Sequence, residues 1–159
     1  MEHKPHKAKR DLLVDVVGVG MAPDDLTQAH LDLIARADLL AGGRRHLEWF
    51  PDCTCDTFDI TADLPGLIER IRRLPGRRIV VLASGDPLYY GIGAYLTRAL
   101  GSDAVRIHPN VTSVAAAFAR MGEPWQDAAV VSLHGRDQTH ALERALRTAE
   151  RIAVFTDPR

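Results

Sequence analysis

Short apolar runs alternate with amphipathic stretches along most of this chain. Residues 12–19 and 79–83 are rich in Val, Ile and Leu without regular polar alternation, which is typical of strands buried on both faces of a parallel sheet. Residues 64–74 repeat Leu and Ile at helical spacing and stop at Pro75–Gly76, which predicts an amphipathic helix. Because the two patterns keep alternating, we predict an α/β fold with a mostly parallel sheet flanked by helices.

The remaining elements follow from the same two patterns. Further strands are expected at 39–41, 57–60 (a weak edge strand), 105–107, 129–133 and 152–155, and further helices at 24–37 (capped by Asp24 and Asp25), 46–50, 92–100, 111–121 and 139–149.

One break in this pattern, at Gly122–Glu123–Pro124, predicts a domain junction. We therefore expect a disordered polar tail at 1–10, an N-terminal α/β domain at 11–124, and the start of a C-terminal α/β domain at 125–159. Since only one β–α–β pattern follows the junction, we expect the chain to be truncated within that second domain.

Composition narrows the class of protein. The 159 residues are 46% hydrophobic, with 20 Lys and Arg against 21 Asp and Glu, so the chain can fill a core and lacks the basic excess of a general nucleic-acid binder. No apolar run approaches a membrane span, and the polar start is unlike a secretory signal. Cys53 and Cys55 are too close together for an ordinary disulfide framework, so we expect reduced thiols and a cytoplasmic protein.

Two glycine-containing loops follow predicted strands, at the sheet edge where ligands of open α/β folds bind. The loop 18–24 has Gly18 and Gly20 but Pro23 in place of the third glycine of a dinucleotide fingerprint, so it is either a ligand loop or only a tight turn. The loop 83–93 carries Asp86 and two tyrosines, and its backbone N–H groups suit an anion. Asp86 suits an ammonium, a sulfonium or a ribose hydroxyl, although it is also a candidate helix cap.

Other strand ends carry further candidate residues. Arg44 and Arg45 follow Gly42–Gly43, where they are either partners for acidic groups of a substrate or an ordinary surface pair. His134 is either a proton carrier or a structural imidazole. The histidines and cysteines lack metal-ligand spacing, so we expect no metal site.

Taken together, these loops resemble the tetrapyrrole (corrin/porphyrin) methylase family. The resemblance is carried by Gly18–Val19–Gly20 with Leu26–Thr27, by Ala83–Ser84–Gly85–Asp86–Pro87 with Tyr90–Gly91, and by Val111–Thr112–Ser113. Three further stretches resemble the branch that methylates C-5 of a corrin-ring precursor: 42–47, 122–127 and above all Ser132–Leu133–His134–Gly135–Arg136. Two positions depart from the family pattern, since Met21 stands where proline is usual and Asn110 where glycine is common.

The resemblance implies S-adenosylmethionine as methyl donor, bound in a cleft between two α/β domains. The implied donor-binding residues are Gly18, Gly20, Ser84, Gly85, Asp86, Tyr90, Thr112, Ser113 and Thr156, and the implied substrate-binding residues are Gly43, Arg44, Arg45 and Arg136. His134 is the candidate catalytic base.

The same resemblance implies methylation of precorrin-6Y, precorrin-7 or its cobalt form at C-5 in cobalamin biosynthesis. It also implies a homodimer and a C-15 methylating and decarboxylating partner subunit or domain, with no nucleic acid or membrane involved. Two alternatives stay open: a different acceptor on the same fold (another corrin carbon, ribosomal RNA ribose or a modified histidine), and an inactive donor-binding fragment. A nucleotide-dependent oxidoreductase is disfavoured by the missing third glycine.

Overall fold

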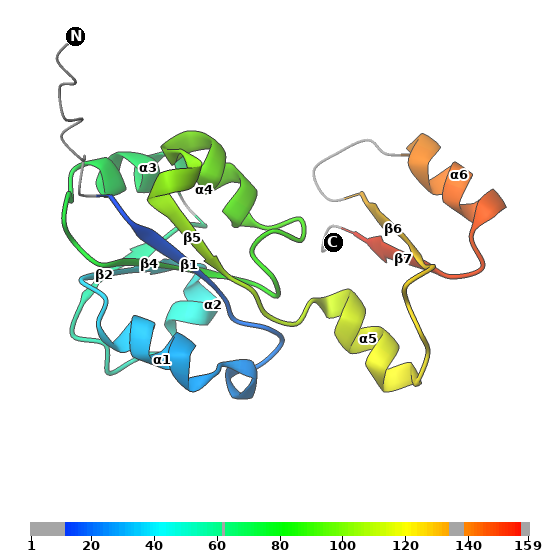
Figure 1. Ribbon diagram of the computed structural model, residues 1–159, viewed down its shortest axis with the longest axis horizontal. Helices are drawn as coiled ribbons and strands as arrows, with labels where there is room; N and C mark the ends of the chain where they lie inside the picture. The colour runs from blue at the N-terminus through cyan, green and yellow to red at the C-terminus, as the bar shows by residue number, and fades with distance from the viewer. Residues whose placement is uncertain (1–11, 62, 134–138, 157–159) are drawn as a thin grey trace, which may run out of the picture. The chain divides into compact units, whose positions relative to one another are not determined.

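The computed structural model describes residues 12–61, 63–133 and 139–156, so the expected tail at 1–10 lies outside the described residues (Figure 1). The chain divides into two compact units between Val111 and Thr112. Helix α5 (Ser113–Met121) therefore belongs to the second unit, whereas the sequence pattern put the junction after this helix, at 122–124.

The first unit contains a five-stranded parallel sheet in the order β3-β2-β4-β1-β5. Its strands are β1 (Val14–Gly18), β2 (Leu39–Gly42), β3 (Asp56–Asp59), β4 (Ile79–Ala83) and β5 (Val105–His108). The predicted parallel α/β architecture is confirmed, and the weak strand predicted at 57–60 is an edge strand.

Two helical layers bury the faces of this sheet (Figure 1). The helices of the first unit are α1 (Gln28–Ala35), α2 (Arg44–Leu47), α3 (Leu64–Arg72) and α4 (Ile92–Leu100), with short 3-10 helices η1 (Pro23–Asp25) and η2 (Ser102–Ala104). On one face Ile79 and Val81 pack with Ile71 of α3, and on the other Val80 and Leu82 pack with Ile34 of α1. Because β4 is covered on both sides, its sequence shows no polar alternation.

The helix predicted at 24–37 begins later than expected. Thr27 is its N-cap, with the side-chain hydroxyl accepting from the His30 N–H at 3.3 Å, so Asp24 and Asp25 do not cap it. The Asp25 carboxylate instead accepts from the backbone N–H groups of Met21 at 2.7 Å and Ala22 at 3.1 Å. The acidic pair therefore shapes the loop that follows β1 and precedes the helix.

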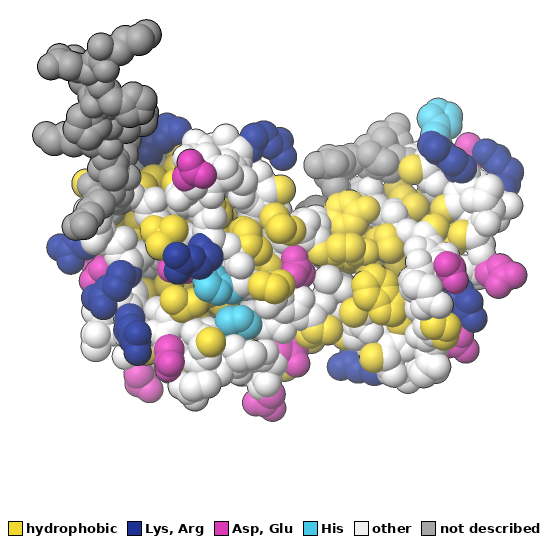
Figure 2. All heavy atoms as spheres, viewed as in Figure 1, with side chains coloured by type: hydrophobic (Ala, Val, Ile, Leu, Met, Phe, Trp, Pro, Cys, Tyr) yellow, Lys and Arg dark blue, Asp and Glu magenta, His cyan; other side chains and the backbone are white. Residues whose placement is uncertain are grey.

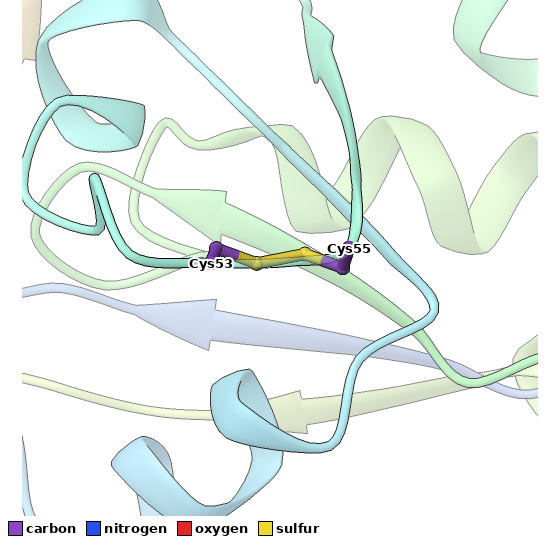
Figure 3. Close-up of a disulfide and its surroundings, with 2 residues drawn as sticks. All are labelled: Cys53 and Cys55. Carbon is purple, nitrogen blue, oxygen red and sulfur yellow. A yellow bond between two sulfur atoms is a disulfide. The ribbon is translucent and has the colours of Figure 1, made fainter.

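Cys53 and Cys55 form a disulfide, so the expectation of reduced thiols is wrong (Figure 3). The bend around Thr54 brings their Cα atoms to 5.4 Å, within the range that a disulfide requires. The bridge precedes β3, at the edge of the sheet opposite to the carboxyl ends of the strands. Close sequence spacing alone therefore did not exclude the bond.

The second unit consists of α5, β6 (Ala129–Ser132), α6 (Thr139–Thr148) and β7 (Ile152–Phe155). The two strands pair in parallel, as the β–α–β pattern predicts. Figure 2 shows hydrophobic side chains gathered over the visible face of this unit. Four large hydrophobic residues of the unit are exposed: Met121, Trp125, Leu146 and Val154. Apolar surface of this kind is typical of interaction sites.

Among the described residues, no helix has both the length and the apolar character needed to cross a membrane.

One ion pair joins the starts of two neighbouring strands. The Asp38 carboxylate, just before β2, accepts from the backbone N–H of Arg78 at 2.8 Å and from its guanidinium at 3.1 and 3.2 Å, just before β4. The hydrogen bonds from the Arg78 side chain, with that from its backbone, lower the pKa of Asp38 to about 2.

We predict an acid-sensitive contribution to stability from Asp38. A lowered pKa stabilises the folded state above the unfolded value of 3.8, and this stabilisation is lost as the pH falls toward 2. Between about pH 5 and about pH 2.5, the free energy of unfolding should therefore fall more steeply for the wild type than for Asp38→Asn. Urea denaturation across this range measures the difference, and parallel curves for the two proteins would contradict the assignment.

Candidate functional site

The carboxyl ends of β1 and β4 lie at the switch point of this sheet, where its connections change direction. The chain leaves β1 toward β2 on one side, and leaves β4 toward β5 on the other. In open α/β sheets such a switch point is where ligands bind. The loops that follow β1 and β4 are the two that the sequence singled out.

These two loops are hydrogen-bonded to each other in both directions. The Gly20 N–H donates to the Gly85 carbonyl at 3.3 Å, and the Gly85 N–H donates to the Gly20 carbonyl at 3.1 Å. Just before this bridge, the Val19 N–H donates to the Ala83 carbonyl at 2.9 Å. The structure thus brings Gly18, Gly20 and Gly85 together.

Asn110, which follows β5, holds the first loop from a third strand. Its Nδ2 donates to the carbonyls of Gly18 at 2.9 Å and Asp25 at 3.0 Å, and its Oδ1 accepts from the Val111 N–H at 2.7 Å. Asn110 and Met21 are the two positions that depart from the family pattern. Both contribute hydrogen bonds here. The backbone N–H of Met21 donates to Asp25, and proline would lack this donor.

The loop after β4 is held by its own backbone and by Asp86. Oδ1 of Asp86 accepts from the Leu88 N–H at 2.8 Å, and the Pro87 carbonyl accepts from the Gly93 N–H at 2.8 Å. The N-cap of α4 is Gly91, so the alternative that Asp86 caps this helix is wrong. Tyr90 has a φ of 56°, which costs a residue with a side chain about 1 kcal/mol or more and is common at functional sites.

Arg44 and Arg45 lie at the carboxyl edge of the sheet, in the turn of helix that follows β2. Ala41 is paired with Val81, so the turn at Gly42–Gly43 comes next to the end of β4. Arg44 donates through Nε to Oδ2 of Asp59 at 3.4 Å. The sheet topology therefore places the start of α2, with both arginines that the sequence assigned to substrate, at the same edge of the sheet as the Ser84–Asp86 loop.

Each arginine contacts a group with an altered pKa. The pKa of Asp59 is lowered mainly by hydrogen bonds from Thr61, with a smaller effect of Arg44. Nη2 of Arg45 lies 3.2 Å from Nε2 of His46, whose ring is buried. Burial, and then the charge of Arg45, lower the pKa of His46, so the ring is neutral at neutral pH.

The other predicted donor residues lie in the second unit. The Thr112 hydroxyl accepts from the Ala115 N–H at 3.0 Å and caps α5, and Ser113 is the first residue of that helix. Thr156 is exposed directly after β7. His134 and Arg136 lie outside the described residues, so their roles stay predictions.

A polar contact between β5 and β1 was not foreseen from the sequence. Nε2 of His108 lies 2.7 Å from Oδ1 of Asp15, joining the end of β5 to β1 just ahead of Asn110. The signal was present, since Asp15 is the polar residue within an otherwise apolar strand. Within the described ranges, no three His, Cys, Asp or Glu side chains are grouped as metal ligands.

Comparison with known proteins gives consistent results. Residues 14–159 match the model of the Tetrapyrrole (Corrin/Porphyrin) Methylases. The chain is 40% identical to the cobalt-precorrin-7 C(5)-methyltransferase of Salmonella typhimurium, over 92% of this chain and 72% of that protein. It is 39% identical to the precorrin-6Y C(5,15)-methyltransferase (decarboxylating) of a Sinorhizobium species, over 65% of this chain and 25% of that protein.

A solved structure agrees with these sequence matches. The precorrin-6Y methylase of Archaeoglobus fulgidus superposes with a TM-score of 0.69 at 26% identity, covering 91% of this chain and 73% of that one. With the hydrogen-bonded glycine loops at the switch point of the parallel sheet, these matches lead to one conclusion: the chain belongs to the tetrapyrrole methylase family.

Proposed function

We propose that this protein transfers a methyl group from S-adenosylmethionine to C-5 of a corrin-ring precursor, precorrin-7 or its cobalt form, in cobalamin biosynthesis. The observation that carries the proposal is the 40% identity with the Salmonella cobalt-precorrin-7 enzyme over 92% of this chain. The sheet supports it, because the loops that carry Gly18, Gly20 and Gly85 meet at the β1–β4 switch point.

The loops after β1 and β4 approach each other closely, which supports a site built on both loops. A Cβ added to Gly18 would lie 2.6 Å from the Gly85 carbonyl oxygen and 2.9 Å from Cδ of Pro87, so the two loops are already in contact there. Gly20 and Gly85 have φ values of 64° and 60°, which favour glycine. We assign the donor to Gly18, Gly20, Ser84, Gly85, Asp86 and Tyr90, with Thr112, Ser113 and Thr156 from the second unit.

When bound, S-adenosylmethionine supplies an electrophilic methyl group on a sulfonium. Methyl transfer to a nucleophilic carbon then depends mainly on alignment and on the exclusion of water, which contribute several kcal/mol. In this proposal Asp86 binds the donor through its negative charge. Arg44, Arg45 and Arg136 bind the carboxylates of the macrocycle, with Gly43 allowing close approach. His134 is the residue we assign to proton removal from the methylated carbon.

We also propose a homodimer and a partner that methylates and decarboxylates at C-15. The exposed Met121, Trp125, Leu146 and Val154 support an interaction surface on the second unit. The Sinorhizobium relative supports the partner, since its name includes both C-5 and C-15 methylation and decarboxylation.

The charge of Asp86 is separable from its role in the loop. Asp86→Asn keeps an oxygen that accepts from the Leu88 N–H, whereas Asp86→Ala removes both the acceptor and the charge. We expect Asp86→Asn to weaken the binding of S-adenosylmethionine about tenfold or more, and Asp86→Ala to abolish it, as measured by titration calorimetry. Wild-type affinity in Asp86→Asn would show that the carboxylate only shapes the loop.

The contact between the loops gives a second test. Gly18→Ala forces a Cβ against the Gly85 carbonyl, so we expect roughly 1–3 kcal/mol of lost stability together with weaker donor binding. Gly43→Ala is the matched control, because its nearest neighbour would lie 3.9 Å away. Thermal unfolding and calorimetry of both variants measure the two effects. Equal tolerance of the two substitutions would contradict the close approach.

A methylation assay tests the function itself. The protein is incubated with methyl-labelled S-adenosylmethionine and, separately, with precorrin-7, its cobalt form or ribosomal RNA. We expect the labelled methyl group in a corrinoid product and none in RNA. NMR of the product should show that the methyl group is attached to C-5. Transfer to RNA alone, or to no acceptor, would overturn the proposed reaction.

A further inference from the structure

His46 is a buried titratable residue at the carboxyl edge of the sheet, with no role so far in the proposed reaction. It is 7% exposed, whereas Arg44 and Arg45 before it are exposed. The ring lies edge-on to Trp49, with centroids 5.1 Å apart and an angle of 70° between the planes. This packing fixes the orientation of the imidazole.

The contact between Arg45 and His46 is unusual for neighbours on a helix. Adjacent residues of a helix point in different directions, so the Arg45 side chain must fold back to bring Nη2 to 3.2 Å from Nε2 of His46. Arginine has donors and no acceptor, so His46 must accept here with a neutral ring. The buried imidazole thus selects one orientation of a long and otherwise free side chain.

The two arginines of this turn are held by partners of different charge. Asp59 is a carboxylate, so its contact with Nε of Arg44 offsets part of the positive charge of that residue. The neutral imidazole of His46 orients Arg45 without cancelling its charge. Of the two, Arg45 is therefore better prepared to bind an anionic group.

From this geometry we propose that His46 is a positioning residue, which holds the guanidinium of Arg45 in place to bind a carboxylate of the tetrapyrrole acceptor. The inference rests on the proposed function, because it deepens the assignment of Arg45 to the acceptor. Arg45 provides the main electrostatic contact of this turn, and Arg44 a weaker one.

The test is a binding measurement that needs no catalysis. Uroporphyrin, a stable tetrapyrrole with carboxylate side chains, is titrated into the protein and its affinity is read from fluorescence. His46→Phe keeps a ring but has no acceptor, and should weaken binding roughly five- to tenfold. His46→Gln offers an amide oxygen to Arg45 and should restore most of that loss.

A double-mutant cycle shows whether His46 acts through Arg45. Arg45→Ala should weaken binding more than Arg44→Ala, and adding His46→Phe to Arg45→Ala should have no further effect. Arg73→Ala is the control, since Arg73 pairs with Glu69 on the exposed face of α3, away from this turn. Thermal unfolding of every variant separates a local effect from a loss of the fold.

The pKa of His46, measured by NMR titration, distinguishes the contact with Arg45 from a role in packing alone. The charge of Arg45 contributes to the lowered pKa of His46, so Arg45→Ala should raise that pKa toward 6.5. An unchanged pKa would contradict the contact. Wild-type affinity in His46→Phe, an additive loss in the double variant, or a wild type that does not bind uroporphyrin would overturn the positioning role.

Failure of this proposal is distinct from failure of the proposed function. If methyl transfer is absent while uroporphyrin affinity follows the Arg45–His46 pattern, the positioning role stands and the reaction does not. If precorrin-7 is methylated while His46→Phe binds uroporphyrin like the wild type, the reaction stands and the positioning role falls.

Discussion

The candidate site depends on the reciprocal hydrogen bonds between Gly20 and Gly85. They join the loops of two central strands at the point where the chain changes direction across the sheet. Both glycines are in the left-handed region of φ, which residues with a Cβ adopt only at a cost. The side-chain amide of Asn110 adds a third strand to this junction, because it donates to the backbone carbonyls of Gly18 and Asp25.

The order of the strands separates two kinds of chemistry at this edge. The loop after β4 contributes the half-buried Asp86, which suits the cationic donor proposed above. The next strand, β2, contributes the two arginines, which suit an anionic acceptor. Neighbouring strands lie about 4.8 Å apart, so the two regions are adjacent without sharing residues.

Much of the fold was predictable because its strands are buried on both faces. The apolar runs in β1 and β4 predict central parallel strands, and the short run in β3 predicts an edge strand. The start of α1 was not predictable in this way, since Asp24, Asp25 and Thr27 are all good caps. Asp25 does not cap the helix because the N–H groups of Met21 and Ala22 lie within reach of its carboxylate, and this position is known only from the structure.

The sequence singled out the loops that carry the glycines and Asp86, but not the contacts that hold these loops in place. A loop rich in glycine after a strand is visible in the sequence, and the sheet rule places such loops together. The contacts of Asn110, Asp15 and His46 were missed because they join distant strands or require a side chain to fold back. Such long-range hydrogen bonds leave no periodic pattern in a sequence.

The Cys53–Cys55 bridge has a consequence for how the molecule responds to reduction. In the chain-entropy model, a cross-link stabilises a protein by restricting the unfolded chain, and a 15-residue loop gains about 3 kcal/mol. A bridge that closes over Thr54 alone restricts the unfolded chain much less. A reductant would therefore loosen the turn before β3. The stability of the sheet, and of the hydrogen-bonded loops at its opposite edge, would change little.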